Sequence, residues 1–157
     1  MDFKKCNYVE ELDLFNQLDH RYVRVTNAVW EKPSRGTKGS AGYDFHSPYD
    51  VYIKKGKTVR FPLNYKVENM EPGTVLLMFN RSSLSMKHGL QIDNAVGVID
   101  SDYKDAIWVQ ITNRGKKDYR ISTNDKVVQG VFVKYSTVDS DDDSQAVRKG
   151  GFGSTGR

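Results

Sequence analysis

The chain has 157 residues, enough to bury the core of one ordinary domain, and nothing in its composition calls for a second. Its single cysteine, Cys6, excludes an internal disulfide, and no apolar run reaches the length of a membrane span or a signal-peptide core. We therefore expect a soluble protein of a reducing compartment, either the cytoplasm or, for a viral protein, the host cytoplasm, with no membrane partner.

Charge and metal-binding residue types narrow the possible ligands. The formal net charge is +4, but the basic residues form short, scattered groups such as Lys4-Lys5 and Lys116-Lys117, which are typical of solvated turns. No stable nucleic-acid binding is therefore expected. The histidines share no metal-ligand spacing with one another or with Cys6, so any metal is expected to arrive with phosphates.

Short runs rich in Val, Ile, Tyr, Phe and Thr dominate the chain, separated by Gly, Pro, Asn and Asp, and this pattern predicts β-strands. One helical stretch is expected first, over Val9–Leu18, where an apolar residue recurs at every third position. The expected strands then follow in chain order: Tyr22–Thr26, Asp50–Ile53, Thr58–Pro62, Tyr65–Val67, Thr74–Phe79, Gln91–Ile92, Ala95–Ile99, Ile107–Thr112 and Val127–Tyr135. Turns are expected at Lys55-Gly56, Glu71–Gly73, Asn113–Gly115 and Thr123–Asp125. Many short strands at this spacing favour an all-β sandwich or barrel.

A further short helix is predicted over Ser82–His88, with serines suited to the N-cap and Gly89 suited to the position after the C-cap. Backbone N–H groups, serine hydroxyls and the Arg81 guanidinium would meet at its start, which suits a phosphate. Ordinary capping of the helix, beside a solvated arginine, is the alternative interpretation of the same residues.

The segment Asp93–Tyr103 combines an amide, an apolar hairpin-like run, carboxylates and an aromatic ring. An exposed hairpin backbone, supplemented by Asn94, could imitate a pairing edge for a base. Tyr103 could pack on a deoxyribose, and Asp100, at the end of an apolar strand, is placed like a general base that polarises a water. A strand followed by an Asx-type turn is the alternative interpretation.

The C-terminal segment Gly150–Arg157 places Phe152 among glycines, hydroxyls and a cation. A flexible flap of this kind can lay a ring on a base and donate hydrogen bonds to phosphate, which makes a nucleotide the first ligand to consider. A frayed terminus is the alternative.

Five short motifs in these segments resemble, in order and approximate spacing, those of the homotrimeric all-β dUTPase family. They are Ala41–Asp44, Arg81–Ser83, the run from Asn94 to Tyr103, Val127–Gln129 and Gly150–Gly156. The third and fifth are highly specific. The resemblance runs from about Tyr22 to Arg157. We accordingly expect an N-terminal extension of unknown role (1–21), a dUTPase-like β domain (22–138), and an acidic linker with a flexible Gly-rich flap (139–157).

The resemblance implies an all-β jelly-roll (β-clip) subunit with one short helix, assembled as a homotrimer whose active sites lie at the subunit interfaces. Each site would hydrolyse dUTP to dUMP and diphosphate with Mg²⁺ as cofactor, keeping uracil out of DNA and supplying dUMP for dTTP synthesis.

The resemblance also implies roles for individual residues. Asp100 would activate the water that attacks the α-phosphorus, Tyr103 would exclude ribose, and Asp44 would act on the metal indirectly, through water. The remaining residues would bind substrate: uracil by Asn94, Gly97, Val98 and Phe152, and phosphates by Arg81, Ser82, Ser83, Gln129, Arg148, Gly153, Ser154 and Thr155.

Some positions depart from the family pattern. Lys126 stands where an arginine is common, which replaces a bidentate contact by a point charge. Asp105 and Ser83 stand where glycines are common. Arg148 lies one residue closer to Phe152 than the flap arginine of the family, so Lys149 is a rival for its phosphate contact.

Two other functions remain open from the sequence. A dCTP deaminase-like enzyme shares the fold, although the intact run Gly97–Asp100 favours dUTP. A regulatory or binding protein could also keep the dUTPase fold, and a dUTPase could itself have an additional regulatory protein partner.

Overall fold

The computed structural model describes residues 1–5, 23–25, 31–138 and 148. These residues contain one helical turn and the following strands: β1 Asp2–Lys5, β2 Val23–Val25, β3 Ser34–Arg35, β4 Tyr43–His46, β5 Tyr49–Ile53, β6 Thr58–Pro62, β7 Tyr65–Glu68, β8 Thr74–Asn80, β9 Leu90–Ile92, β10 Gly97–Ile99, β11 Trp108–Asn113, β12 Tyr119–Ile121 and β13 Lys126–Lys134. The helical turn is η1, Ser83–Lys87. The expected helix over Val9–Leu18 and the segment Gly150–Arg157 lie outside the described residues.

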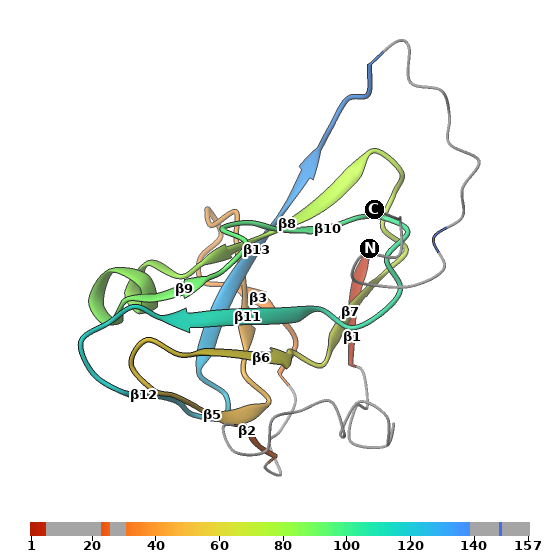
Figure 1. Cartoon of the computed structure of the whole chain (residues 1–157). Coiled ribbons are helices and arrows are strands. Elements are labelled where there is room, and N and C mark those ends of the chain that lie inside the picture. The colour runs from red at the N-terminus through yellow and green to blue at the C-terminus, as the bar shows by residue number, and fades with distance from the viewer. Residues whose placement is uncertain (6–22, 26–30, 139–147, 149–157) are drawn as a thin grey trace.

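Every strand pairing in the described chain is antiparallel, which confirms the all-β fold class. The largest sheet has the order β10-β8-β13-β4-β3. Three smaller sheets have the orders β6-β11-β9, β12-β5-β2 and β1-β7. In Figure 1, β8 and β10 lie above the pair formed by β6 and β11. The described part of the chain contains no helix with the length and hydropathy of a membrane span.

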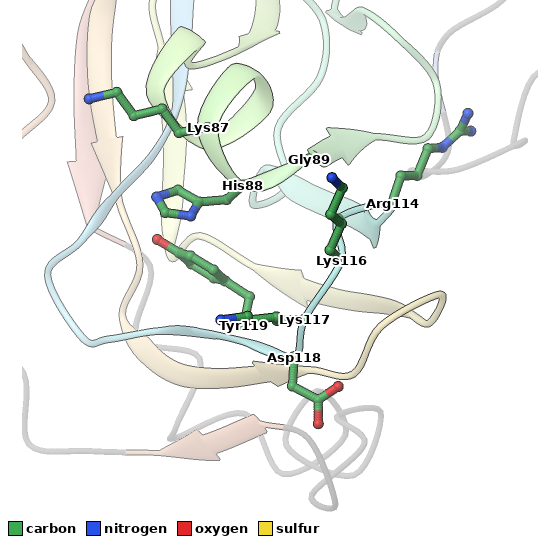
Figure 2. Close-up of a pocket in the computed structure, with 9 residues that line it drawn as sticks. Lys87, His88, Gly89, Arg114, Lys116, Lys117, Asp118 and Tyr119 are labelled. Atoms are coloured by element: carbon green, nitrogen blue, oxygen red, sulfur yellow. The ribbon is translucent and has the colours of Figure 1, made fainter.

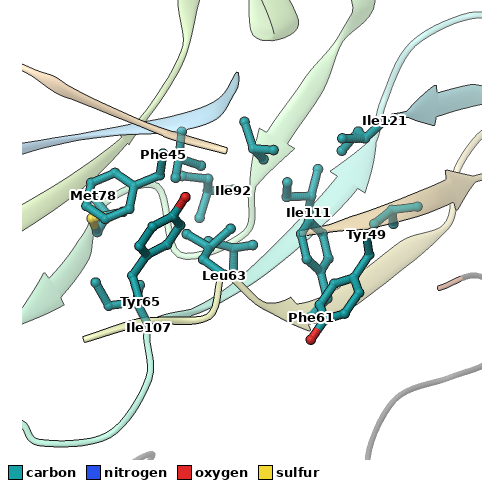
Figure 3. Close-up of a cluster of buried hydrophobic side chains, with 14 of the residues drawn as sticks. Phe45, Tyr49, Phe61, Leu63, Tyr65, Met78, Ile92, Ile107, Ile111 and Ile121 are labelled. Carbon is teal, nitrogen blue, oxygen red and sulfur yellow. The ribbon is translucent and has the colours of Figure 1, made fainter. Parts of the chain in front are cut away.

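The core lies between these sheets, and several strands contribute to it by alternating buried and exposed residues. Val109 and Ile111 of β11 are buried, whereas Gln110 between them is exposed, as a half-buried strand requires. Figure 3 shows Phe45 of β4 and Ile111 of β11, which belong to different sheets, in one cluster with Leu63 from the connection between β6 and β7. The buried Tyr49 hydroxyl donates to Asn64 Oδ1 at 3.0 Å, so this polar atom is satisfied inside the apolar cluster.

Residues 2–5, which the sequence places in an extension, form strand β1 and pair with β7 from Asp2–Glu68 to Lys5–Tyr65. Phe3 is the buried residue of this strand. Its ring lies 5.3 Å from Tyr43, 5.2 Å from Phe45 and 5.6 Å from Phe132, measured between centroids. The first strand therefore closes an aromatic cluster to which β4 and β13 also contribute.

The predicted short helix is present, but its start differs from the expectation. Residues Ser83–Lys87 form a π-helical turn, and Ser82 has helical angles with no side-chain cap hydrogen bond. The expected serine cap is therefore wrong, because Ser82 is already part of the helical path and cannot fold its hydroxyl back onto it. The expected end is confirmed, since Gly89 adopts φ +71°.

Candidate functional site

Three of the sequence motifs meet because strands β8, β13 and β4 lie side by side. Gln129 of β13 is opposite Asp44 of β4 and also opposite Phe79 of β8. Arg81 follows directly after the end of β8. Residues far apart in sequence are thereby brought to one end of the largest sheet.

Asp44 binds two cations at this end of the sheet. Its Oδ1 accepts from Arg81 Nε at 3.0 Å, and its Oδ2 accepts from Lys126 Nζ at 2.8 Å. Arg81 Nη1 also donates to the Lys126 carbonyl at 3.3 Å. The Asp44 side chain is 13% exposed, so these contacts are partly shielded from water. We call Asp44, Arg81 and Lys126 the cationic cluster. Both oxygens of Asp44 are engaged, and the two cations together leave an excess of positive charge.

Gln129 is held beside this cluster by its amide. Its Nε2 donates to the carbonyl of Asn80 at 3.1 Å. A Cβ at Gly42 would lie 2.7 Å from Gln129 Oε1, so the side-chain amide of Gln129 packs directly on the glycine of the first motif. Asn80 also accepts from Ile92 N–H through Oδ1 at 2.9 Å. The sequence reasoning missed Asn80, whose place directly before Arg81 was the available signal. Ser82 is exposed and Ser83 half-buried.

His46 lies two residues beyond Asp44 on β4 and is buried. Its Nε2 is 3.7 Å from Glu31 Oε2, and its Nδ1 has no hydrogen-bond partner among the described residues. Burial lowers the pKa of His46, so the neutral imidazole is favoured.

The turn before β10 connects two sheets. Ala95 adopts φ +58°, and the N–H groups of Ala95 and Val96 donate to Ile92 and Asn94. Strand β9 pairs with β11, whereas β10 pairs with β8. The segment expected to form a hairpin is therefore a tight turn that joins two sheets, and the strands on either side of it, β9 and β10, do not pair with each other. The expected strand from Ala95 begins only at Gly97 because the left-handed residue interrupts the extended backbone.

Strand β10 is nevertheless suited to the recognition of a base. It is the edge strand of its sheet in the described chain, so it presents N–H and C=O groups on its outer side. Gly97 packs closely on β8, where a Cβ would lie 3.1 Å from Met78 Cβ. Asn94 and Val98 are exposed, and Asn94 also lines a cavity of about 230 Å³ with Trp108.

Asp100 follows β10 and lies in a turn closed by the Tyr103 N–H, which donates to the Asp100 carbonyl at 3.1 Å. Its carboxylate is half exposed and is bound by Arg148, with Nη2 2.5 Å from Oδ2. Arg148 Nε also contacts Asp102 Oδ1 at 2.9 Å, and its guanidinium carbon lies 5.8 Å from the centre of the Tyr103 ring. The hydrogen bond that Arg148 donates to Asp102 raises the pKa of Arg148 above its ordinary value. Three residues of the third motif thus surround one arginine.

The described contacts gather some of the predicted site residues into two groups, whereas Ser82, Ser83, Asn94, Gly97 and Val98 belong to neither. The cationic cluster and Gln129 form one, and Asp100, Tyr103 and Arg148 form the other, with Asp102 added to it by the structure. The predicted flap residues Phe152, Gly153, Ser154 and Thr155 lie outside the described residues.

A dUTPase family model matches residues 28–156. The chain belongs to the dUTPase family. A deoxyuridine 5'-triphosphate nucleotidohydrolase of Lactococcus lactis is 38% identical over 141 residues, covering 85% of this chain and 93% of that protein. One from Hydrogenovibrio crunogenus is 35% identical over 133 residues, covering 80% and 87%.

Solved dUTPase structures agree with this assignment. The dUTPase of Streptococcus mutans superposes with a TM-score of 0.68 at 29% identity, covering 88% of this chain and 99% of that one. A mutant dUTPase from phage phi11 of S. aureus, described with a structural Mg(II) ion, gives a TM-score of 0.64 at 24% identity. It covers 74% of this chain and 92% of that one, and its likeness supports the fold.

Proposed function

We propose that this dUTPase family member hydrolyses dUTP to dUMP and diphosphate, which keeps uracil out of DNA and supplies dUMP for dTTP synthesis. The observation that carries the proposal is Asp100, an exposed carboxylate at the end of an edge strand, three residues before the Tyr103 ring. A carboxylate in this place can accept a proton from water, and the edge strand beside it can accept a base.

In the proposed reaction, Asp100 accepts a proton as its water attacks the α-phosphorus, and diphosphate leaves. Arg148 Nη2 donates to Oδ2 of this carboxylate. Movement of the guanidinium would open this position on Oδ2 to a water. The phosphates of dUTP offer the arginine an alternative anion.

The other residues bind and orient the substrate. The outer edge of β10, at Gly97 and Val98, would pair with uracil, helped by Asn94, while Tyr103 packs on the deoxyribose. Positive charge from the cationic cluster would attract the phosphates, with Gln129, Ser82 and Ser83 as hydrogen-bond donors. Lys126 forms an ion pair with Asp44. A lysine at this position therefore supplies the positive charge of an arginine but not its bidentate hydrogen bonding.

Mg²⁺ is the cofactor that we propose, and the residues present fit an ion carried by the substrate. The described chain contains no group of three or more His, Cys, Asp and Glu side chains suited to hold a metal. Both Asp44 oxygens already accept from cations, so Asp44 would act on the ion only indirectly, through water. When bound to the triphosphate, Mg²⁺ would neutralise charge on the phosphate oxygens and the leaving diphosphate.

Assembly is the remaining part of the proposal. We expect a homotrimer, in which residues from more than one subunit complete each site, as membership of the dUTPase family implies. Phe152 would stack on uracil and Gly153, Ser154 and Thr155 would contact phosphates as the C-terminal segment closes over the substrate.

The test is dUTP turnover measured with dCTP, dTTP and UTP as controls, in wild type and Asp100→Asn. Only dUTP should be hydrolysed at a high rate, because unpaired buried polar groups penalise the wrong nucleotides. The variant should bind nucleotide but lose about 10²- to 10⁴-fold in kcat. Ammonia release from dCTP would indicate a deaminase, and near-normal kcat in Asp100→Asn would exclude Asp100 as the base.

A mixing experiment tests the shared sites. The Asp100→Asn chain and a chain lacking 150–157 are each expected to be nearly inactive as pure trimers. Mixed trimers should regain activity, because some sites then take Asp100 from one chain and the C-terminal segment from another, so that neither change affects them. A monomer in light scattering with full activity would contradict this part of the proposal.

A further inference from the structure

The end of η1 and the loop between β11 and β12 border an open groove of about 520 Å³. Figure 2 shows the residues that line it, which include Lys87, His88, Arg114, Lys116, Lys117 and Tyr119. We call these six residues the basic groove. None of them belongs to the proposed dUTP site, so a ligand of this groove can bind whether or not the protein hydrolyses dUTP.

Positive charge in the basic groove is not neutralised by its neighbours. None of its four Lys and Arg side chains forms an ion pair with another described residue. Asp118 is the one acidic residue of the groove lining, and its Oδ1 accepts from the Lys55 N–H at 2.8 Å. In Figure 2 the Asp118 carboxylate lies on the side away from Lys87 and His88. The groove therefore favours an anion.

The backbone that carries these cations is fixed. Asn113 is fully buried, and its Nδ2 donates to the carbonyls of Ile53 and Lys117 at 2.9 Å, while its Oδ1 accepts from the Gly115 N–H at 2.9 Å. The Arg114 N–H donates to the Gly89 carbonyl at 2.9 Å. A Cβ at Gly115 would lie 2.2 Å from the His88 carbonyl oxygen, so the loop is pressed against the end of η1. Little backbone entropy is then lost when the groove binds a ligand.

An aromatic pair lies in the same groove. The rings of His88 and Tyr119 are 4.7 Å apart between centroids, at an interplanar angle of 48°. Tyr119 is half-buried and supports the ring, whereas His88 is exposed and can receive a further ring. Cations that track a phosphate chain beside a ring on which a base can stack are the features of a site for single strands.

We propose that the basic groove binds the phosphate backbone of single-stranded DNA, with an unpaired base against His88. Lys87 and Arg114 lie at opposite ends of the groove in Figure 2, which suits a chain of phosphates better than one phosphate. Arg114, Lys116 and Lys117 form a short basic run in the sequence, and the fold adds Lys87 to it. This proposal revises the expectation from sequence that the scattered lysines bind no nucleic acid.

The test measures binding of a labelled single-stranded oligodeoxynucleotide without uracil to the full chain, by fluorescence anisotropy over a range of salt concentrations. Contacts to about four phosphates should give a slope of about −3 for log K against log salt, hence a loss of about 50-fold between about 50 and 200 mM. Lys116→Glu/Lys117→Glu should weaken binding at least about tenfold and bring the slope to about −1.5, with dUTP turnover unchanged.

Lys4→Glu/Lys5→Glu is the matched control. It reverses another adjacent, exposed lysine pair and changes the net charge equally. Binding should fall much less in this variant than in the groove variant. Equal losses in the two variants would show a response to net charge alone and overturn the proposal.

Two competition experiments distinguish single-stranded DNA from other anionic ligands. Duplex DNA should bind more weakly than the single strand, because its bases cannot reach His88. Duplex binding as tight as single-strand binding, or displacement of the strand by stoichiometric inorganic triphosphate, would overturn the proposal.

Discussion

Replacement of Asp44 by asparagine should disrupt the cationic cluster while leaving the shape of the side chain. The carboxylate now accepts from Arg81 and Lys126 with its two oxygens. An asparagine can offer an oxygen to only one of them and turns an N–H₂ group toward the other. The two cations would then lose the orientation that we propose they need to bind phosphates.

The contacts set the size of the effect. Arg81 is 28% exposed, and a charge-assisted hydrogen bond of this kind contributes about 2 kcal/mol. Lys126 is 41% exposed, so water screens its contact and its contribution falls to at most about 1 kcal/mol. The sum of about 2–3 kcal/mol corresponds to a loss of up to about 30- to 150-fold in kcat/KM for dUTP, mainly through KM.

Asp50 provides a matched control on another sheet. Its side chain is 12% exposed, it binds Arg120 Nη2 at 2.8 Å and it accepts from the Thr123 N–H at 2.9 Å. Asp50→Asn should therefore lower thermal stability about as much as Asp44→Asn, with kcat/KM unchanged. The assays are steady-state diphosphate release and thermal unfolding by circular dichroism at one protein concentration. A rise in kcat/KM for Asp44→Asn would refute the reasoning, because Asp44 would then merely neutralise the cations, and equal kinetic losses in both variants would refute it as well.

Two predictions concern the core. Gly130→Ala should lower the free energy of unfolding by about 1–3 kcal/mol. The added Cβ would lie 2.8 Å from Leu76 Cδ1 and 2.9 Å from Phe45 Cε2. Gly39→Ala is the control and should leave stability unchanged, because a Cβ there has nothing within 4 Å. Equal melting temperatures for the two variants would contradict this. Burial raises the pKa of Tyr65 to about 12, so the folded state holds this proton more tightly than the unfolded state, whose tyrosine titrates near 10, and stability should fall as pH rises from 10 to 12. Urea unfolding should show a smaller loss over this range in Tyr65→Phe, and identical pH profiles would exclude a contribution from Tyr65.

Local patterns in the sequence predicted most of the strands, because alternation reports burial within a few residues. Thr58–Pro62 agrees in both bounds, and Thr74–Phe79 is one residue short. Strand β4 was missed because its four residues include two polar ones, Asp44 and His46. These become partly or wholly buried only when β13 pairs alongside.

The motifs identified the site residues but could not give their partners. Asp44 and Lys126 are 82 residues apart, and Asp100 and Arg148 are 48 apart, so their contacts depend on the register of distant strands and on tertiary placement. Asn113 is a similar case. It lay in a predicted turn, yet its amide joins that loop to Ile53 of β5, which no local pattern reveals.

The aromatic cluster around Phe3 has a consequence for how the chain folds during synthesis. Strand β1 leaves the ribosome first, but its partner β7 begins at Tyr65, and the Phe132 ring that packs on Phe3 belongs to the last strand. Phe3 can therefore become buried only after nearly the whole described sequence has been synthesised. Contacts between such distant segments are typical of slow-folding topologies. A fusion partner placed directly before Asp2 would lie at this late-closing strand, so expression yield should depend on the length of the linker that separates them.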